Sequence, residues 1–464
     1  MVRGRTEGAA ALFGRELRRL RQQRGLSLRD LSKVIGFTPG YLSKVENGRA
    51  ASPELARACD DTLVGGGALV ALATAEASVR PAQLPGGIRR FVGRDEQLAL
   101  LDTAGARVAI VDGPPGSGKT VLALRWAHHA VDRFPDGQLY VDLRGHSSHA
   151  RPVEPRVALA EFLIALGVPA TGVPDDLDRC AALFRSVVAD RHLLVVLDNA
   201  ADADQVRPLL PAAPGCVVMI TSRERLSSVA VQTNALRVTL GPMTPADSVA
   251  LIRRVIGDER ADAEPAAVAD LAVRCGLLPL ALRIAAERVL AQPYSLIRDL
   301  VDELDTDGRL EVLSTFDSVA LRTVFDWSYR RLDEPCARMF RLLGLHRGPH
   351  LGVGAAAALA DLPMAAARSL LDRLAGAHLV QAVGRDRYQL PDLLREYAAE
   401  LVTAEESGPA VARMAEWRQA STPARELFLE FGDQEGVGGA LATPSGPTRA
   451  ADLHARTTPE PLGA

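Results

Sequence analysis

A glycine-rich segment that begins at residue 113 has the residue types and the spacing of a phosphate-binding loop. It fits the pattern G-x-x-x-x-G-K-[ST], in which glycines allow backbone N–H groups to curl around a phosphate chain. The lysine adds a positive charge, and the final hydroxyl can bind Mg²⁺. The pattern therefore predicts a nucleotide-binding loop formed by Gly113, Pro114, Pro115, Gly116, Ser117, Gly118, Lys119 and Thr120.

The alternative is a glycine-rich turn that precedes a lysine by chance. The chain has 39 glycines but only three lysines, which are Lys33, Lys44 and Lys119. A chain of this composition would contain the pattern by accident in roughly two of a thousand cases. Because arginine has displaced lysine almost everywhere else, a lysine at position 119 favours the phosphate role, for which a compact ammonium suits better than a planar guanidinium.

A phosphate loop of this kind needs a strand before it and a helix after it. The apolar run at 108–112 predicts the strand, and the apolar segment 121–127 predicts the helix. Further strands are predicted at 138–143, 192–199 and 216–223. Strands that alternate with helices indicate an α/β core with a parallel sheet.

The strand predicted at 192–199 delivers a carboxylate, Asp198, near its carboxyl end. P-loop proteins hold Mg²⁺ there, so Thr120 and Asp198 are the predicted metal site. The next residue is Asn199, whose amide cannot accept a proton from an attacking water. This favours slow hydrolysis and a switch over a motor. A structural role for Asp198, as an acid in a strand-end turn, remains the alternative.

Charge is distributed unevenly along the chain. The 464 residues carry a net charge of −3, but residues 1–50 carry +7 and the remainder −10. Such asymmetry indicates that the amino-terminal end meets a polyanion.

The amino-terminal region, residues 14–63, has helical periodicity. Ser27 with Asp30 predicts the start of one helix, and Thr38 with Pro39 predicts the start of the next. Residues 35–37 form the turn between them, where Gly36 can adopt positive φ. The residues spaced for one buried face are Leu17, Leu20, Leu28, Leu31 and Val34.

Segments 17–28 and 41–49 resemble the Xre/Cro-like helix-turn-helix domains of bacterial repressors. The resemblance implies that a helix at 39–46 enters the major groove of double-stranded DNA. The alternative is a small helical bundle with a solvated basic face. The residues expected to meet DNA are Arg29, Thr38, Tyr41, Ser43, Lys44, Asn47 and Arg49.

Residues 91–98 together with the phosphate loop resemble the start of the NB-ARC group of signal-transduction (STAND) ATPases. The resemblance implies that Val92 and Arg94 line the adenine pocket and that Arg223 senses the terminal phosphate of ATP. It also implies that Pro279, in a segment similar to the G-L-P-L-A signature, packs against adenine. Lys119, Asp198 and Arg223 are then the candidate catalytic residues.

The resemblance extends to a winged-helix domain and covers about residues 14–402, closest to actinobacterial regulators of pathways such as secondary metabolism. Relatives usually show a His-Asp pair before Leu-Leu-Arg, whereas this chain has Pro391 before Asp392. The missing histidine would hold the β-phosphate of ADP, so its loss puts the strength of an ADP-locked state in doubt.

The predicted protein is multidomain, with an all-α helix-turn-helix head, an α/β P-loop core, a helical ARC subdomain and a winged helix. No run is long or apolar enough for a membrane helix, and the five scattered cysteines predict neither zinc nor disulfides. A cytoplasmic protein is expected. The predicted boundaries are 1–66 for the head, 67–90 for a linker, 91–242 for the core, 243–312 for the ARC subdomain, 313–402 for the winged helix and 403–464 for a largely disordered tail.

The sequence leaves three functional hypotheses. The first is a DNA-binding transcription regulator switched by ATP, ADP and Mg²⁺, which forms homo-oligomers with ATP and is at most a slow ATPase. The second is a P-loop phosphotransferase or ATPase enzyme. The third is an ATP-independent DNA-binding protein whose nucleotide site has decayed.

Overall fold

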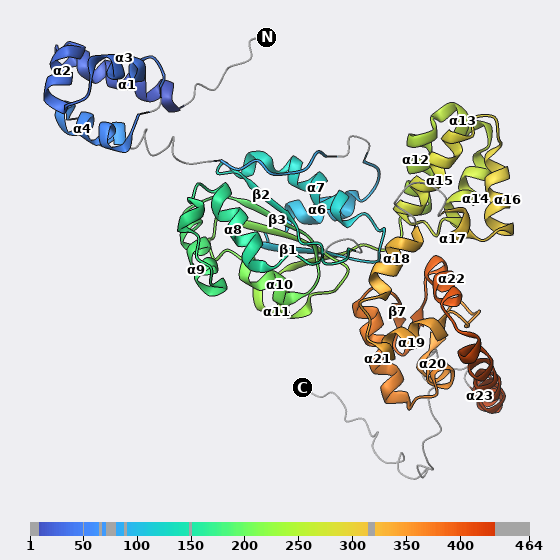
Figure 1. Ribbon diagram of the computed structural model, residues 1–464. Helices are drawn as coiled ribbons and strands as arrows, with labels where there is room; N and C mark the ends of the chain where they lie inside the picture. Colours follow the sequence, from blue (N-terminus) through green and yellow to red (C-terminus); the bar gives the residue numbers. More distant parts are fainter. Residues whose placement is uncertain are drawn as a thin grey trace, which may run out of the picture. The chain divides into compact units, whose positions relative to one another are not determined.

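The computed structural model describes residues 9–49, 51–64, 67–70, 80–87, 91–147, 151–313 and 321–431 (Figure 1). The chain divides into two units, Met1–Asp302 and Glu303–Ala464. The first contains a helical head, an α/β core and a set of helices that follows the core. The second is helical with a small sheet. The predicted multidomain fold class is confirmed.

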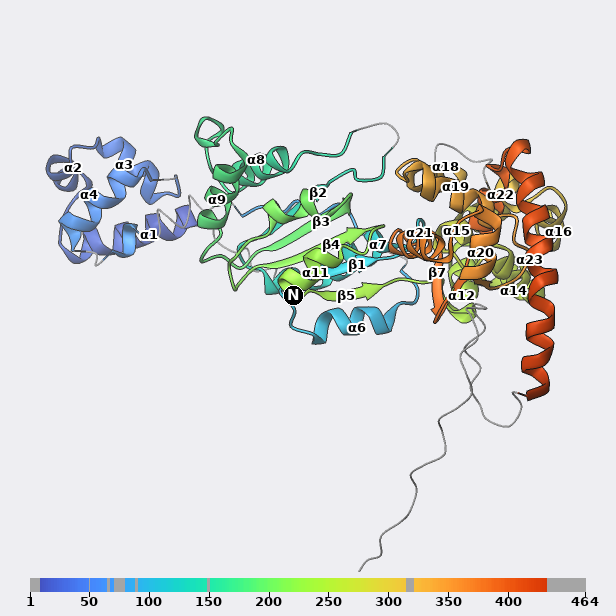
Figure 2. The same cartoon turned by 90° about the horizontal axis from the view of Figure 1, so that it is seen from below.

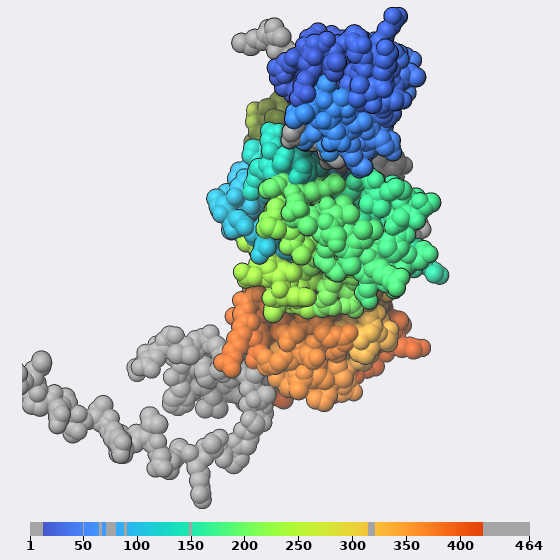
Figure 3. Space-filling view, turned by 90° about the vertical axis from the view of Figure 1, so that its left-hand side faces the viewer, coloured from blue at the N-terminus to red at the C-terminus, as the bar shows by residue number. Residues whose placement is uncertain are grey.

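Among the described residues of the head, four helices have starts that follow from local sequence. They are α1 (Ala9–Gln23), α2 (Leu28–Ile35), α3 (Pro39–Glu46) and α4 (Pro53–Leu63). The Ser27 hydroxyl accepts from the Asp30 N–H while the Asp30 carboxylate accepts from the Ser27 N–H, which is a complete capping box. Thr38 caps α3, and Gly36 ends α2 with φ 74°. In the space-filling view of Figure 3 the head, in blue, presents a continuous rounded surface.

The core of the head differs at one position from the predicted buried face. Leu17 and Leu31 are fully buried, whereas Val34 is 64% exposed. Ile35, one residue further along, packs against the core instead. The reason is that α2 is only 8 residues long and presents Leu28, Leu31 and Ile35 on one face, so Val34 turns toward solvent.

Helices α1 and α3 are joined by contacts that the periodicity did not indicate. The side chain of Glu46 is only 2% exposed and forms ion pairs with Arg21 at 2.6 Å and Arg18 at 3.1 Å. A Cβ at Gly14 would lie 2.5 Å from the carbonyl oxygen of Val45. Close backbone approach and a paired buried carboxylate therefore fix the position of α3 in the head.

The linker predicted at 67–90 is shorter in the structure, because both of its ends belong to folded parts. Leu69 is fully buried in the core of the head. Ala82 forms a parallel bridge with Gln138, whose N–H donates to the carbonyl of Pro81 at 2.7 Å. Leu84 packs on the core of the α/β domain. Residues 71–79 and 88–90 of the predicted linker lie outside the described residues.

Five parallel strands form the sheet of the α/β core, in the order β2-β3-β4-β1-β5. The strands are β1 (Val108–Asp112), β2 (Gln138–Asp142), β3 (Leu194–Ala200), β4 (Val217–Ser222) and β5 (Leu236–Thr239). The chain order reverses at β1, since later strands lie on both of its sides. Ligands of such sheets bind outside the carboxyl ends of the strands at this point.

Helices cover both faces of the sheet (Figures 1 and 2). One face packs Ile110, Val195 and Val218 under Phe162 and Phe184, and the other packs Val111 and Met219 under Leu122 and Trp126. Alternate residues of each strand serve the two layers. The helices of the core are α6 (Asp95–Thr103), α7 (Lys119–His129), α8 (Pro155–Ala165), α9 (Leu177–Val187), α10 (Ala203–Val206) and α11 (Ser227–Thr233), with 3₁₀ turns at Val131–Arg133, Ala170–Gly172 and Arg207–Leu209.

Helices follow the sheet, in the region where a helical ARC subdomain is predicted. They are α12 (Pro245–Ile256), α13 (Asp258–Ala263), α14 (Pro265–Arg274), α15 (Pro279–Ala291) and α16 (Ile297–Thr306). The predicted boundary at 312 lies later than the division between the two units. Helix α17 (Arg309–Val312) packs within the second unit, where Arg309 forms an ion pair with Glu396.

The second unit has the helix and strand order of a winged helix. Its elements are α18 (Leu321–Tyr329), α19 (Glu334–Leu343), β6 (Leu351–Gly352), α20 (Val353–Ala360), α21 (Met364–Gly376), β7 (Gln381–Gly384), β8 (Arg387–Gln389) and α22 (Asp392–Glu400). The three strands pair antiparallel in the order β6-β8-β7. Among the residues that the model describes, no helix has the length and apolar character needed to cross a membrane.

The first part of the segment predicted as a largely disordered tail, 403–464, is helical. Residues 404–431 form α23 (Ala404–Phe431). Tertiary contacts stabilise it, because Glu406 pairs with Arg341 at 2.7 Å and Arg413 donates to the carbonyls of Ala358 and Leu359. The prediction for 432–464 concerns residues that lie outside the described ones.

The difference between Leu31 and Val34 gives a test of the head. Leu31→Ala should destabilise the head by about 2–5 kcal/mol, because it leaves a cavity in the core. Val34→Ala should change stability by less than about 0.5 kcal/mol, as expected of an exposed position. Hydrogen exchange of the α2 and α3 amides in the full chain measures both, and equal effects would contradict the observed face of α2.

Candidate functional site

The phosphate loop leaves β1 at the point where the strand order reverses, and its glycines adopt positive φ, with close contacts at Gly113 and Gly116. Gly113 has φ 148°, and a Cβ there would lie 2.4 Å from the carbonyl oxygen of Leu240. Gly116 has φ 78°, with the Cβ of Leu280 3.1 Å from the same built position. Gly118 has φ 90° directly before α7. The backbone therefore forms a cradle at a helix N-terminus, which suits a phosphate chain.

Lys119 lies in this cradle and is half-buried. Its Nζ donates to the carbonyl oxygens of Gly113 at 2.9 Å and Pro114 at 2.8 Å. Burial and, to a lesser extent, the positive charge of Arg223 lower the pKa of Lys119 to about 7, while Asp198 and Asp112 oppose the shift. A phosphate would supply the negative charge that favours the ammonium form.

Asp198 and Thr120 lie side by side, as the predicted metal site requires. The Thr120 hydroxyl donates to Asp198 Oδ1 at 2.8 Å, and the hydroxyl of Thr221 donates to the same oxygen at 2.5 Å. Burial raises the pKa of Asp198, an effect that these hydrogen bonds counter. A carboxylate and a hydroxyl are oxygen ligands of the kind Mg²⁺ takes, so these residues fit the ion that would neutralise charge on a nucleotide.

Two anchors of Asp198 were not recognised as such in the sequence. Tyr140, in β2, donates its hydroxyl to Asp198 Oδ2 at 3.1 Å. Thr221, in β4, also accepts from the N–H of Asn199 at 2.9 Å. Asn199 has φ 55° and donates its amide to Asp142 at 3.3 Å. The signal that could have found them is position, because all lie toward the carboxyl ends of adjacent parallel strands.

Arg223 directly follows β4 and reaches the same region. It is 9% exposed, and burial lowers its pKa to about 10. Its charge acts on Lys119, so both cations share one electrostatic environment.

Hydrogen bonds join the segments around Arg94 and Pro279 to the phosphate loop; that of Arg94 is donated by its guanidinium. Leu280, next to Pro279 at the start of α15, donates its N–H to the carbonyl of Gly116 at 3.2 Å. Met243 donates to the carbonyl of Leu277 at 2.9 Å, and Arg94 donates to the carbonyl of Gly241 at 2.5 Å. These contacts link the segments at 94, 241–243 and 277–280 to the phosphate loop.

Of the residues predicted to surround the adenine, Val92 lines a cavity of about 730 Å³, together with Phe91 and residues of α12 and the turn that follows it. Val92 is half-buried in it. Arg94 has φ 67°, and burial lowers its pKa. Pro279 lies beside the phosphate loop instead, because its Cγ is 4.0 Å from the position that a Cβ of Gly118 would occupy. Pro279 therefore contacts the phosphate loop, while Val92 lines the cavity.

The predicted DNA-contacting residues lie on or beside α3, except Arg29 on α2. Arg29, Thr38, Lys44, Asn47 and Arg49 are exposed, and Tyr41 and Ser43 are half-buried. Arg49 lies over the ring of Tyr41 at 5.4 Å, and Asn47 accepts from Arg18 at 3.2 Å. Lys44 is thus an exposed cation on the predicted groove helix, whereas the side chain of Asn47 already has a partner in the head.

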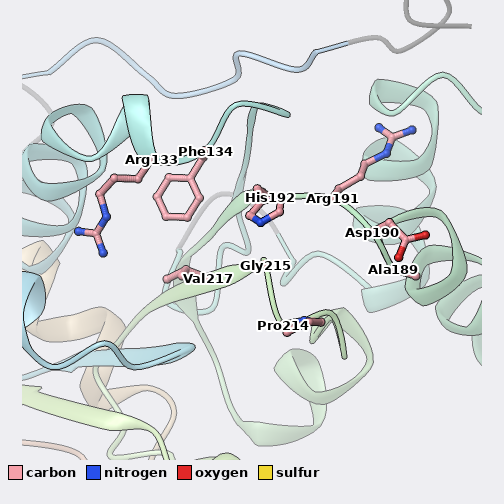
Figure 4. A pocket seen from close by; sticks show the side chains of 9 residues that line it. All are labelled: Arg133, Phe134, Ala189, Asp190, Arg191, His192, Pro214, Gly215 and Val217. Carbon is pink, nitrogen blue, oxygen red and sulfur yellow. The ribbon is translucent and has the colours of Figure 1, made fainter. Parts of the chain in front are cut away.

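A second cavity, of about 540 Å³, lies next to the amino ends of β3 and β4, whereas the phosphate loop lies at the carboxyl ends of the strands. Figure 4 shows the rings of Phe134 and His192 facing its middle and the guanidinium of Arg191 pointing away. None of the predicted site residues lines it.

This fold and these sites define a helix-turn-helix protein with a P-loop nucleotide-binding core. Residues 12–73 match the family model described as a helix-turn-helix domain. The regulatory protein AfsR of Streptomyces griseus is 41% identical over 345 residues, which cover 73% of this chain and 35% of AfsR. AfsR of Streptomyces coelicolor is 43% identical over 338 residues, which cover 70% of this chain and 33% of AfsR.

The chain thus spans about a third of the length of these curated relatives. Among solved structures, a STAND protein with a tetratricopeptide repeat sensor from Pyrococcus horikoshii matches with 19% identity and a TM-score of 0.33. That match covers 74% of this chain and 47% of the other, and a score this low supports no argument about function.

Asp198→Asn tests the metal site. It should weaken Mg²⁺-dependent nucleotide binding about 10- to 100-fold, because an interaction with a charged group contributes about 1.5–3 kcal/mol. Titrations of labelled ATP with Mg²⁺ and with EDTA measure the difference. Asp142→Asn, at the end of neighbouring β2, is the matched control and should change affinity less than about threefold. A loss that is equal with and without Mg²⁺ would favour the purely structural role for Asp198.

Proposed function

We propose that this protein is a cytoplasmic DNA-binding regulator of transcription that is switched by ATP and ADP. The observation that carries the proposal is the occurrence in one chain of a basic helix-turn-helix head and a built phosphate site around Lys119. The name of its relatives, regulatory protein AfsR, supports the same direction. The domain boundaries and the site residues named above belong to this proposal.

In this proposal ADP favours a closed form and ATP with Mg²⁺ favours an open form that self-associates. Paired heads would then bind half-sites about 34 Å apart, one turn of the DNA helix. Moving the equilibrium from 1:99 to 99:1 requires about a 10⁴-fold preference of ATP for the open form. The groups that can supply this difference are Lys119, Arg223 and the metal held by Asp198 and Thr120.

Slow hydrolysis fits a switch of this kind. Asn199 stands where a second carboxylate would polarise the attacking water, and its amide is already bonded to Asp142. Transfer of phosphate to a small acceptor remains an outcome that the test can reveal. Rapid phosphorylation of an added acceptor would favour an enzyme over a switch.

The three lysines of the chain provide a matched set of variants. Lys119→Ala should abolish nucleotide binding and the nucleotide dependence of DNA binding. Lys44→Ala should keep nucleotide binding and weaken DNA binding by about 1–3 kcal/mol, or roughly 5- to 100-fold. Lys33→Ala, exposed on α2, is the control and should change neither property.

The DNA would be selected from a random pool with ATP, with ADP and without nucleotide. Different enrichment in the three pools supports the switch. Enrichment that is identical in all three, together with unchanged DNA binding by Lys119→Ala, would instead support a DNA-binding protein with a decayed nucleotide site.

Self-association gives a separate prediction. Light scattering should show a larger particle mass with ATP and Mg²⁺ than with ADP, because only the ATP form exposes the associating surface in this proposal. The Lys119→Ala variant should have the same mass under both conditions. A wild-type mass that does not depend on the nucleotide would contradict ATP-dependent assembly.

A further inference from the structure

An ion pair between a fully buried carboxylate and a half-buried arginine lies directly beside the phosphate loop and has no part in the nucleotide chemistry described above. Asp112 is the last residue of β1, directly before Gly113, and its side chain is fully buried. Arg237 of β5 lies beside it, with Nε 3.4 Å from Oδ2. A fully buried carboxylate is costly unless a positive group compensates it, so the pair needs an explanation.

The guanidinium of Arg237 has a second set of contacts on the other side. Its Nη2 donates to the carbonyl oxygen of Arg225 at 2.7 Å and lies 3.5 Å from the hydroxyl of Ser227. Arg225 is two residues beyond Arg223. One planar side chain therefore connects the end of the strand before the phosphate loop to the segment that carries the sensor arginine.

The strand register explains how these residues meet. In the sheet Asp112 lies between Ser222 of β4 and Thr239 of β5. Ser222, the residue before Arg223, is fixed because its hydroxyl donates to the carbonyl oxygen of Ala200 at 2.9 Å. After Arg223, the side chain of Leu226 is buried in the apolar core, and the guanidinium of Arg237 donates to the carbonyl oxygen of Arg225. The sensor segment is thus fixed at both ends.

We propose that Arg237 is a positioning residue that fixes the sensor segment 223–227 relative to the phosphate loop and thereby tunes discrimination between ATP and ADP. This inference rests on the proposed nucleotide switch. Arg223 is the residue expected to sense the extra phosphate of ATP, whereas the loop and Lys119 serve both nucleotides. Displacement of the sensor segment should consequently affect ATP more than ADP.

The competing explanation is that Arg237 only neutralises Asp112. Loss of the arginine would then leave a buried negative charge next to the phosphate loop, which would weaken ATP and ADP alike. The two explanations differ in what happens when the carboxylate is removed as well. A double-mutant comparison of Arg237 and Asp112 therefore separates them.

The experiment measures the dissociation constants of ATP and ADP with Mg²⁺, and the thermal midpoint, for the full chain and four variants. Arg237→Met should raise the ratio of the ATP constant to the ADP constant about tenfold. Arg237→Met should also lower the thermal midpoint, because it leaves the charge of Asp112 without its partner. Adding Asp112→Asn to Arg237→Met should restore the thermal midpoint but should not restore the ratio of the two constants. Arg237→Lys keeps a charge beside Asp112 without the planar fork, so it should keep the midpoint and lose part of the discrimination.

Arg207→Met is the matched control, because Arg207 is another arginine whose Nη2 donates to a serine of α11, Ser228, at 3.0 Å. It should leave the ratio unchanged. A ratio that is normal in Arg237→Met, or restored in the double variant, would overturn the positioning role while leaving the nucleotide switch intact. Absence of nucleotide binding in the wild-type protein would instead overturn the proposed function itself.

Discussion

The burial of charged groups at the carboxyl edge of the sheet is the constraint on which the rest of the core depends. The order β2-β3-β4-β1-β5 places the buried side chains of Asp112, Asp198 and Arg223 and the half-buried Lys119 at or just beyond the ends of the strands. Charges removed from water must be paired or hydrogen-bonded. Each of them consequently has a defined partner or an altered pKa, and the geometry of the phosphate site follows from these pairings.

The balance of these charges is suited to an anionic ligand. Lys119 is held by carbonyl oxygens and has a pKa lowered to about 7 by burial, while Asp198 is held by three hydroxyl groups. Carbonyl dipoles compensate an ammonium less well than a phosphate does. A bound nucleotide would therefore replace weak partners of Lys119 by a strong one, and that gain is available to drive a conformational change.

Residues 83–85, which lie in the chain between the head and the α/β core, contact the core. Gln83 accepts from the N–H of Tyr140 at 3.2 Å, and the hydroxyl of that same tyrosine binds Asp198. The imidazole Nε2 of His128, in the helix that follows the phosphate loop, is 2.7 Å from the carbonyl oxygen of Pro85. The chain that leads from the head thus contacts both β2 and the end of α7.

The sequence by itself determined the features that depend on neighbouring residues. The capping box at Ser27, the glycine turn at Gly36, the phosphate loop and the apolar strand that ends near Asp198 are all local, because caps, positive φ and alternating burial need only a few adjacent residues. Tertiary structure decided the features that join distant segments. Examples are Tyr140 against Asp198, Arg237 against Asp112, the pairing of Ala82 with Gln138, the choice of Ile35 over Val34, and the helix at 404–431. Strand order and packing create these contacts, and no periodicity within one segment encodes them.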